Sequence, residues 1–384
     1  MTRNIRLIAL HNFLVFFRPQ WAFLAIYCAQ VTGSYTIGMA AMATHRIVGA
    51  IADIPTGILS DKIGRKYTLV LGSALLLLAT SCFAFATGAI EMFAGAILIG
   101  LAESMFSGNN DALLYEDLQE HQKTAMLTRH QSHSDSLVQL GLGLSALLST
   151  LFVQDGLKLV FAIGIFPHAL ALLTSLFFAN KRLPKEHHPH GRWQNFKESL
   201  RYVLRNKRLS LLMAGNALGS GAAEAHFAFI TVFIQQLWPT WGLGFYRAAH
   251  HLMAFSGFLF VHRLLSRIKP ILAVISIRIY VPVSCSLALL FANALSPLFY
   301  LSNGLTYGTT SVGVKSLMQQ EFTDKQRATL GSVASFATKF VYGATNMVMG
   351  ILADHFGIRV AAAFAIGLGV LSLPVYLKVF RKYL

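Results

Sequence analysis

Predominantly apolar stretches recur along the chain, each about as long as the ~20 residues that a helix needs to cross a lipid bilayer. Short breaks rich in charged residues, Gly, Pro and Asn separate them. The pattern predicts twelve membrane-spanning helices, over residues 6–30, 36–58, 68–87, 90–111, 131–153, 158–179, 208–235, 243–263, 270–292, 297–318, 328–352 and 359–380. We therefore expect an all-α membrane protein.

Composition agrees with this expectation. Of 384 residues, 55% are apolar and only 12% are charged, whereas a soluble globular protein carries about 25% charged residues. These values exclude a soluble enzyme and a disordered chain. The three cysteines, Cys28, Cys82 and Cys285, lie far apart in or beside apolar stretches. We expect them to be packing thiols, with no disulfide and no metal site.

The distribution of basic residues predicts the orientation in the membrane. A net charge of +16 would favour nucleic-acid binding in a soluble chain. In a membrane protein, however, Lys and Arg of short loops are retained on the cytoplasmic side. With a cytoplasmic N-terminus, 24 of the 32 Lys and Arg residues fall in cytoplasmic segments, and only Lys158 and Arg359 fall in external loops. We therefore expect a multi-pass protein of the inner (plasma) membrane with both termini in the cytoplasm and no nucleic-acid partner.

One long polar segment, residues 181–207, divides the predicted helices into two groups of six. We interpret it as a cytoplasmic linker with a short surface helix around Trp193 to Leu204, between an N-terminal bundle (1–180) and a C-terminal bundle (208–384). Its histidines 187, 188 and 190 could bind a metal, but a solvated linker is favoured.

Two weak internal matches relate the halves. Residues 117–123 resemble 321–327 at an offset of 204, and residues 156–158 resemble 357–359 at an offset of 201. Parallel repeats of this kind build two-half transporters.

Ionisable residues within the predicted helices are costly in a membrane, so we interpret them as functional. Six lie close to the bilayer centre when counted from the helix ends at ~1.5 Å per residue, although the one in the ninth helix lies nearer the cytoplasm. We assign to a substrate cavity Arg18, Arg46, Glu103, Glu224, Lys339 and Arg278. Four bases against two acids favour a substrate with an anionic group. A set of purely structural salt bridges is the alternative.

The same residues suggest how protons could be coupled to transport. Glu224 is the preferred coupling group, because the protonation of a carboxylate near the midplane can follow substrate binding. Glu103 is the alternative, and His226 could relay a proton to Glu224. For a lone intramembrane histidine such as His168, a packed and hydrogen-bonded role is expected.

The loop after the second predicted helix carries the most specific motif, G-I-L-S-D-K-I-G-R-K-Y-T-L over residues 57–69. Gly57 permits close approach of a neighbouring helix, and Gly64 supplies an unrestricted turn residue. Asp61 is suited to a helix N-terminus, whereas Arg65 and Lys66 occupy positions where cytoplasmic bases belong.

This loop closely resembles motif A of the major facilitator superfamily, G-x-L-x-D-x-x-G-R-K-x-x-L, at every defined position. The resemblance implies two six-helix bundles that rock about a central cavity, a monomer, and docking of Asp61 against the start of the eleventh helix around residues 329–332. It also implies that Arg65 pairs with an acid after the fourth helix, for which Glu116 and Asp117 are the candidates.

Two further residues complete the gating set that we predict. Asp111 and Lys315 occupy equivalent positions under the offset of 204, in the fourth and tenth helices. We expect them to approach each other, or each other's bundle, when the cytoplasmic side closes.

The resemblance implies a secondary active transporter that moves a small molecule by alternating access, coupled to protons, with efflux favoured slightly. Ser104 stands where drug/proton antiporters usually carry an Arg, and no Pro occurs in residues 140–144, which weakens an assignment to multidrug export. Uptake or export of an organic anion such as a siderophore is an alternative, and a non-transporting membrane sensor is an alternative of another class.

Enzymatic activity is not expected. The sequence lacks G-x-S-x-G, H-E-x-x-H and Walker motifs, so we predict no catalytic residues, no cofactor and no metal. The expected partners are the small-molecule substrate, protons and the lipid bilayer.

Overall fold

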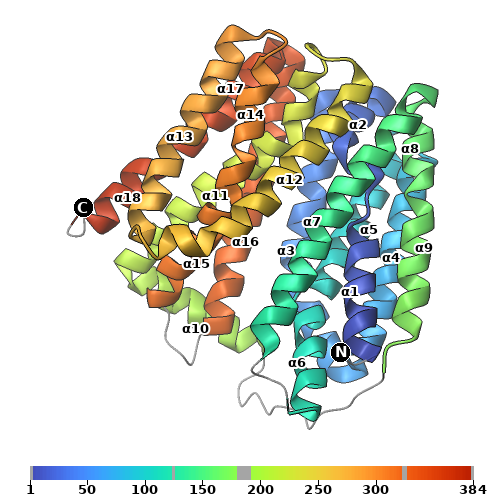
Figure 1. Cartoon of the computed structure of the whole chain (residues 1–384), viewed down its shortest axis with the longest axis vertical. Helices are drawn as coiled ribbons and strands as arrows, with labels where there is room; N and C mark the ends of the chain where they lie inside the picture. Colours follow the sequence, from blue (N-terminus) through green and yellow to red (C-terminus); the bar gives the residue numbers. More distant parts are fainter. Residues whose placement is uncertain (1–2, 123–125, 180–191, 322–326, 382–384) are drawn as a thin grey trace. The chain divides into compact units, whose positions relative to one another are not determined.

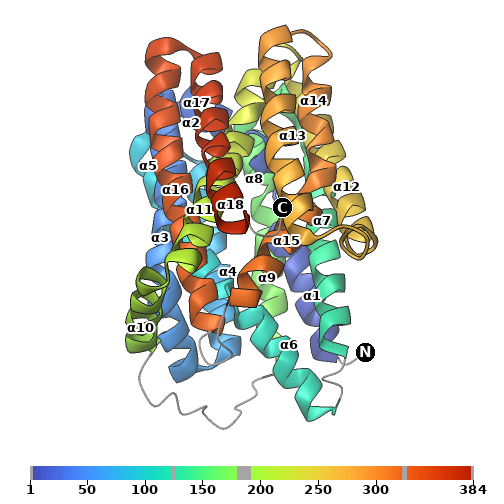
Figure 2. The ribbon, with the colours of Figure 1, turned by 90° about the vertical axis from the view of Figure 1, so that its left-hand side faces the viewer.

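The computed structural model describes residues 3–122, 126–179, 192–321 and 327–381, and within these ranges it contains helices and turns but no strand (Figures 1 and 2). The predicted all-α class is therefore confirmed. The linker histidines 187, 188 and 190 and most of the repeat segment 321–327 lie outside the described residues.

The chain forms two compact units. Unit 1 contains residues 1–27, 44–189 and 240–248, and unit 2 contains residues 28–43, 190–239 and 249–384. Residues 28–43 of the first half belong to unit 2, and residues 240–248 of the second half belong to unit 1. The helices α2, α3 and α12 therefore begin in one unit and continue in the other.

Unit 1 is built mainly from the first half of the chain. The helices of the first half of the chain are α1 (Arg3–Phe16), η1 (Pro19–Ala22), α2 (Leu24–Thr32), α3 (Tyr35–Ile63), α4 (Arg65–Ala84), α5 (Ala89–Phe106), α6 (Asn109–Glu120), α7 (Leu127–Phe152), η3 (Val153–Asp155), α8 (Leu157–Ile163) and α9 (Ile165–Leu176). The helix α4 packs against α5 and α9 through fully buried side chains such as Leu69 and Leu76.

Two breaks in unit 1 have clear local causes. The first predicted span is interrupted where Pro19 removes a backbone donor, which separates α1 from η1. The fourth span is interrupted at Gly108, whose φ of 72° is a left-handed value that ends α5 and starts α6. Both breaks place polar side chains next to non-helical backbone inside the bundle.

Unit 2 is built mainly from the second half. Its helices are α10 (Arg192–Arg205), α11 (Lys207–Ile234), α12 (Thr240–Leu265), α13 (Pro270–Phe291), α14 (Ser296–Ser302), α15 (Gly304–Glu321), α16 (Arg327–Phe356), α17 (Ile358–Val370) and α18 (Ser372–Phe380). The central helix α11 packs against α16, α17 and α18. The core includes Leu212, Val274, Leu330 and Tyr376, none of which is exposed.

The observed helices match the twelve predicted spans one by one, as single helices or as consecutive pieces of one span. Among the described residues, eight stretches are long and apolar enough to cross a membrane by length and composition. The four other predicted spans, which are not among these eight stretches, correspond to α1–α2, α12, α14–α15 and α16.

Candidate functional site

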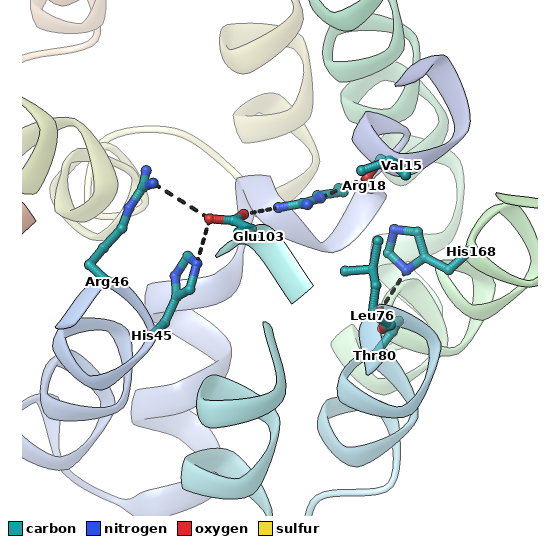
Figure 3. A network of polar contacts seen from close by, with 8 residues as sticks. All are labelled: Val15, Arg18, His45, Arg46, Leu76, Thr80, Glu103 and His168. Atoms are coloured by element: carbon teal, nitrogen blue, oxygen red, sulfur yellow. Dashed lines mark hydrogen bonds and ion pairs between the residues drawn. The ribbon is translucent and has the colours of Figure 1, made fainter. Parts of the chain in front are cut away.

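A cluster of one acid and three bases lies inside unit 1, with Glu103 at its centre (Figure 3). Oε1 of Glu103 lies 2.8 Å from Nη1 of Arg18. Oε2 lies 2.8 Å from Nε2 of His45 and 3.6 Å from Nη1 of Arg46. We call Arg18, His45, Arg46 and Glu103 the Glu103 network. It joins three helical segments, η1, α3 and α5, through a single carboxylate.

Arg18 is positioned by the break at Pro19. In a continuous helix the carbonyl of Val15 would accept a hydrogen bond from the amide four residues later, but that residue is Pro19, which has no N–H. Nε of Arg18 donates to this carbonyl instead, at 2.8 Å. The side chain is 2% exposed, and its guanidinium lies 5.0 Å from the ring centroids of both Phe16 and Trp21.

His45 and Arg46 are neighbours in α3, and adjacent residues on a helix are expected to face different directions. Both nevertheless reach the same oxygen of Glu103, because the imidazole contacts it directly and the longer guanidinium of Arg46 extends toward it, whereas Arg18 lies on the other side of the carboxylate (Figure 3). The side chain of His45 is 5% exposed and that of Arg46 is 29% exposed. Arg46 is therefore the base of the network most accessible to a solute.

The charges of the network do not balance. Arg18 and Arg46 are permanent cations, Glu103 is one anion, and His45 can take up a proton. In the described structure Nη2 of Arg18 is buried and has no hydrogen-bond partner. Within these four residues, the two arginines and the one carboxylate thus sum to a net positive charge even when His45 is neutral.

Close packing of α3 on α5 brings these residues together. A Cβ atom at Gly100 would lie 2.5 Å from the carbonyl oxygen of His45 and 3.0 Å from the amide nitrogen of Gly49. Gly100 therefore permits a backbone-to-backbone approach less than one helical turn from Glu103. The sequence analysis did not select Gly49 and Gly100, although a glycine in each of two predicted spans is a signal of close helix packing.

Two other buried histidines of unit 1 bind to hydroxyl groups on α4. The Thr80 hydroxyl donates to the carbonyl of Leu76 at 3.0 Å, so the proton in its 2.6 Å contact with His168 comes from Nδ1 of the histidine (Figure 3). His11 meets Ser73 in the same way at 2.8 Å, since that hydroxyl donates to Leu69. Both histidines link α4 to its neighbours and have no acid in these contacts.

The motif at residues 57–69 forms a second polar cluster in unit 1, at the junction of α3, α4 and α6. Arg65 lies 3.7 Å from Asp61 and 3.5 Å from Glu116, so Glu116 is the one of the two candidate acids that pairs with it. Asp117 is buried instead beside His121. Gly64 precedes α4 with a φ of 96°, a backbone value that favours glycine.

Two neutral residues hold this second cluster together and were missed from the sequence. Oδ1 of buried Asn109 accepts hydrogen bonds from Ser60 at 2.6 Å and from Arg65 at 2.9 Å. Nothing in their residue types distinguishes them from ordinary helix-end polar residues. Within the motif, Gly57 is buried and Lys66 is half-buried. Asp61 belongs to unit 1 and residues 329–332 belong to unit 2, so the docking of Asp61 on these residues stays a prediction.

The other predicted site residues lie in unit 2 or on exposed helix faces. Glu224 is exposed, Lys339 is half-buried, and His226 is buried with its ring 5.5 Å from that of Tyr300. Arg278 is buried, donates to Ser220 at 3.0 Å and lies over the ring of Tyr376 at 5.8 Å. Asp111 of α6 and Lys315 of α15 are both exposed, in unit 1 and unit 2 respectively.

An acid that sequence analysis did not select, Asp354 at the end of α16, caps the start of α3 within unit 2. Its carboxylate accepts hydrogen bonds from the Ser34 hydroxyl at 2.6 Å and from the amides of Tyr35 and Thr36 at 2.8 and 2.9 Å. The Ser34 oxygen in turn accepts from the amide of Ile37 at 3.3 Å. Three amides of the first turn of α3 are thereby satisfied.

The pH dependence of this cap follows from its hydrogen bonds. Partial burial raises the pKa of Asp354, but the bonds from Ser34, Thr36 and Tyr35 outweigh it and lower the pKa from 3.8 to about 2. A depressed carboxylate pKa contributes stability above the unfolded value, which is lost as pH falls toward the folded value. The cap should therefore be fully formed at every pH above about 5.

We expect Asp354→Asn to lower stability by about 1 kcal/mol, because the amide nitrogen of asparagine cannot accept and the charge at the helix start is lost. Thermal unfolding of the purified protein at several pH values measures the difference. It should be constant from pH 8 to pH 5 and shrink below about pH 4. A difference that changes near neutral pH would show that another group titrates with the cap.

Comparisons with known proteins agree with the geometry. The model of the Major Facilitator Superfamily matches residues 9–344. The chain is 29% identical over 155 residues to the arabinose-proton symporter of Escherichia coli (strain K12), which is 40% of this chain and 32% of the symporter. It is 26% identical over 156 residues to the facilitated glucose transporter member 10 of solute carrier family 2 from Xenopus laevis, again 40% of this chain and 27% of the relative. The chain thus matches about a third of the length of these curated relatives.

Solved structures show the same fold over the whole chain. A mutant of the nucleoside transporter NupG aligns with a TM-score of 0.84 at 15% identity, covering 98% of this chain and 100% of the other. A D-xylose-proton symporter aligns with a TM-score of 0.73 at 13% identity, covering 98% and 97%. With twelve matched spans, the loop motif and a family model that covers most of its length, the chain is a multi-pass membrane protein and belongs to the Major Facilitator Superfamily.

Proposed function

We propose that the protein is a proton-coupled secondary transporter of the inner membrane, with both termini cytoplasmic, that carries a small molecule bearing a carboxylate, phosphate or similar anion. The observation that carries the proposal is the Glu103 network, in which one carboxylate is shared by two arginines and a histidine. The surplus positive charge supports an anionic substrate. The accessible guanidinium of Arg46 is its first binding partner in this proposal.

Proton binding and anion binding would favour each other at such a site. When Glu103 takes up a proton, its negative charge disappears, and Arg18, His45 and Arg46 lose their shared counter-ion. An anionic substrate group can then pair with the released bases. Because coupling between two ligands is reciprocal, a bound anion would in turn favour protonation of Glu103. Substrate and proton therefore occupy the site together, which is the requirement for proton-coupled symport.

Glu103 replaces Glu224 as the preferred coupling group in this proposal. The reason is geometric, because Glu103 contacts three bases in a buried site, whereas Glu224 occupies an exposed position on α11 in unit 2. His45, rather than His226, is the histidine next to the coupling carboxylate. Glu224, His226, Lys339 and Arg278 remain candidates for substrate contacts from unit 2.

The test is a pair of transport assays with Glu103→Gln in proteoliposomes. Exchange of labelled substrate for unlabelled substrate needs no proton, so we expect it to persist. Accumulation driven by a pH gradient should fall by at least about tenfold, since glutamine cannot titrate. Glu91→Gln on the same helix is the matched control, because glutamine can keep the bond from the Gly88 amide. Loss of both activities, or loss of neither, would contradict coupling through Glu103.

The substrate is found by screening anionic, neutral and cationic compounds for proton movement in the same vesicles. The direction of that movement distinguishes efflux, the slightly favoured direction from the sequence, from uptake. Transport of a siderophore or another organic anion would support the charge argument, and recognition of cations alone would refute it.

A neutral sugar is a second candidate substrate, suggested by the partial similarity to the arabinose-proton symporter of Escherichia coli. Its hydroxyl groups could accept hydrogen bonds from Arg18 and Arg46 without a formal charge. Proton movement with a pentose but with no organic anion would select this candidate. Compound binding without any movement of compound or proton would instead indicate a sensor.

A further inference from the structure

The helix α10 lies at the end of unit 2 where the central spanning helix α11 begins (Figures 1 and 2). A single residue, Asn206, separates the two helices. Its side chain caps α11 by accepting from the amide of Leu209 at 3.1 Å, and its amide donates to the carbonyl of Tyr202 at 3.0 Å. The position of α10 next to the membrane-spanning part of the protein is thus fixed by a structured junction.

One face of α10 is packed on the protein. Ser199 and Val203 are 1% and 6% exposed, and Phe196 and Tyr202 pack against the core of unit 2. The ring of Phe196 lies 6.2 Å from that of Phe336 on α16. These contacts hold α10 against α11 and α16 and determine which face points away from the protein.

A second face, about a quarter of a turn around the helix from the packed one, is apolar and basic at once. Trp193, Leu200 and Leu204 are 53%, 39% and 71% exposed, at spacings of seven and four residues that place them on one side of the helix. Lys197 and Arg201 are exposed between them, and Nζ of Lys197 lies 5.9 Å from the centroid of the Trp193 ring. We call Trp193, Lys197, Leu200, Arg201 and Leu204 the outer stripe of α10.

The composition of this stripe is typical of helices that lie in a membrane interface. Such helices combine Trp and Leu with Lys and Arg, and tryptophan prefers the headgroup level. α10 carries four bases, Arg192, Lys197, Arg201 and Arg205, against the single acid Glu198. Its charge is therefore complementary to a surface of anionic phospholipids. The transport site in unit 1 requires none of these residues.

We propose that the outer stripe of α10 binds the surface of the surrounding membrane by inserting Trp193, Leu200 and Leu204 among lipid chains and pairing Lys197 and Arg201 with anionic phospholipid headgroups. Clustered basic residues beside apolar anchors give such contacts a preference for anionic over zwitterionic lipid. The association depends on salt, because the charged part of the contact is screened.

Trp193 provides a native probe for the test. The full chain and its Trp193→Phe variant are reconstituted in bilayers of phosphatidylcholine with about one part in four of phosphatidylglycerol, with bromine on the chains of either lipid at equal mole fraction. The difference between the two proteins isolates the quenching of Trp193. We expect brominated phosphatidylglycerol to quench it at least about twice as strongly as brominated phosphatidylcholine.

Charge variants separate lipid binding from simple proximity. Lys197→Gln, Arg201→Gln and Arg205→Gln together should reduce the quenching ratio to about one. The matched control removes three exposed bases at the end of α12 and in the following turn, Arg263, Arg267 and Lys269, and should leave the ratio unchanged. Equal quenching of Trp193 by both lipids in the unchanged chain would overturn the proposal, and so would no quenching at all, the result expected if the stripe binds a protein.

Discussion

Replacing Glu103 with alanine is expected to lower the free energy of unfolding by about 3 kcal/mol or more. Arg18 is 2% exposed, so its guanidinium would remain buried after its partner carboxylate is removed. The bond to Val15 and the rings of Phe16 and Trp21 would stay, but none of them carries a compensating charge. A fall in the midpoint of thermal unfolding in detergent measures the loss.

A double variant distinguishes the cost of an unpaired charge from a general defect. Arg18→Met combined with Glu103→Leu removes both charges, and replacing a buried pair by apolar residues is often close to neutral. We expect most of the lost stability to return, except about 1 kcal/mol for the Val15 carbonyl, which no longer receives the Arg18 bond. Accumulation driven by a pH gradient should be lost in both Glu103→Ala and the double variant, because neither has a titratable group at position 103. If the double variant is no more stable than Glu103→Ala, the two side chains are not coupled.

Replacing Gly100 with alanine is expected to destabilise the protein by about 1–3 kcal/mol and to abolish most coupled transport. The new Cβ would meet the carbonyl oxygen of His45 at 2.5 Å, and backbone cannot turn away as a flexible side chain can. The helices α3 and α5 would have to separate, which would move His45 and Arg46 away from Glu103. Thermal unfolding and accumulation assays on the same preparation measure both effects.

The chain offers a matched control for this substitution. Gly367 lies in the apolar helix α17, and a Cβ there would meet no atom within 4 Å. Gly367→Ala should therefore be neutral or stabilising by up to about 1 kcal/mol, because alanine has the higher helix propensity. If the two alanine variants behave alike, the close approach at Gly100 does not hold the network together.

The twelve spans and the polar cluster at the loop motif could be predicted from the sequence because each depends on local information. Length and hydropathy define a span. The motif lies in one loop, and Glu116, the acid that pairs with its Arg65, follows the next pair of predicted spans. Arg18, Arg46 and Glu103 were selected for the same reason, since a charge in an apolar run is visible without knowledge of packing.

The pairing within the site could not be predicted, because it depends on how helices rotate and cross. Four deep bases and two deep acids allow many combinations, and the structure joins Glu103 to two of those bases and to His45. Arg278, selected by the same depth argument, binds Ser220 and the ring of Tyr376 instead. Asn109 and Gly100 are equally important to the geometry, but their residue types are too common to be selected.

The bond from Arg18 to the Val15 carbonyl makes the two arginines of the network unequal. Arg18 is held by the backbone, so its orientation does not depend on Glu103 and should survive protonation of that carboxylate. Arg46 is partly exposed and lies at the edge of the network. One cation is thus held in a fixed orientation, so that its field needs no reorientation of the side chain, whereas the other is the more exposed of the two. Because Pro19 has no N–H, the Val15 carbonyl is available to Arg18, and the interruption of the helix thereby fixes the position of a positive charge within unit 1.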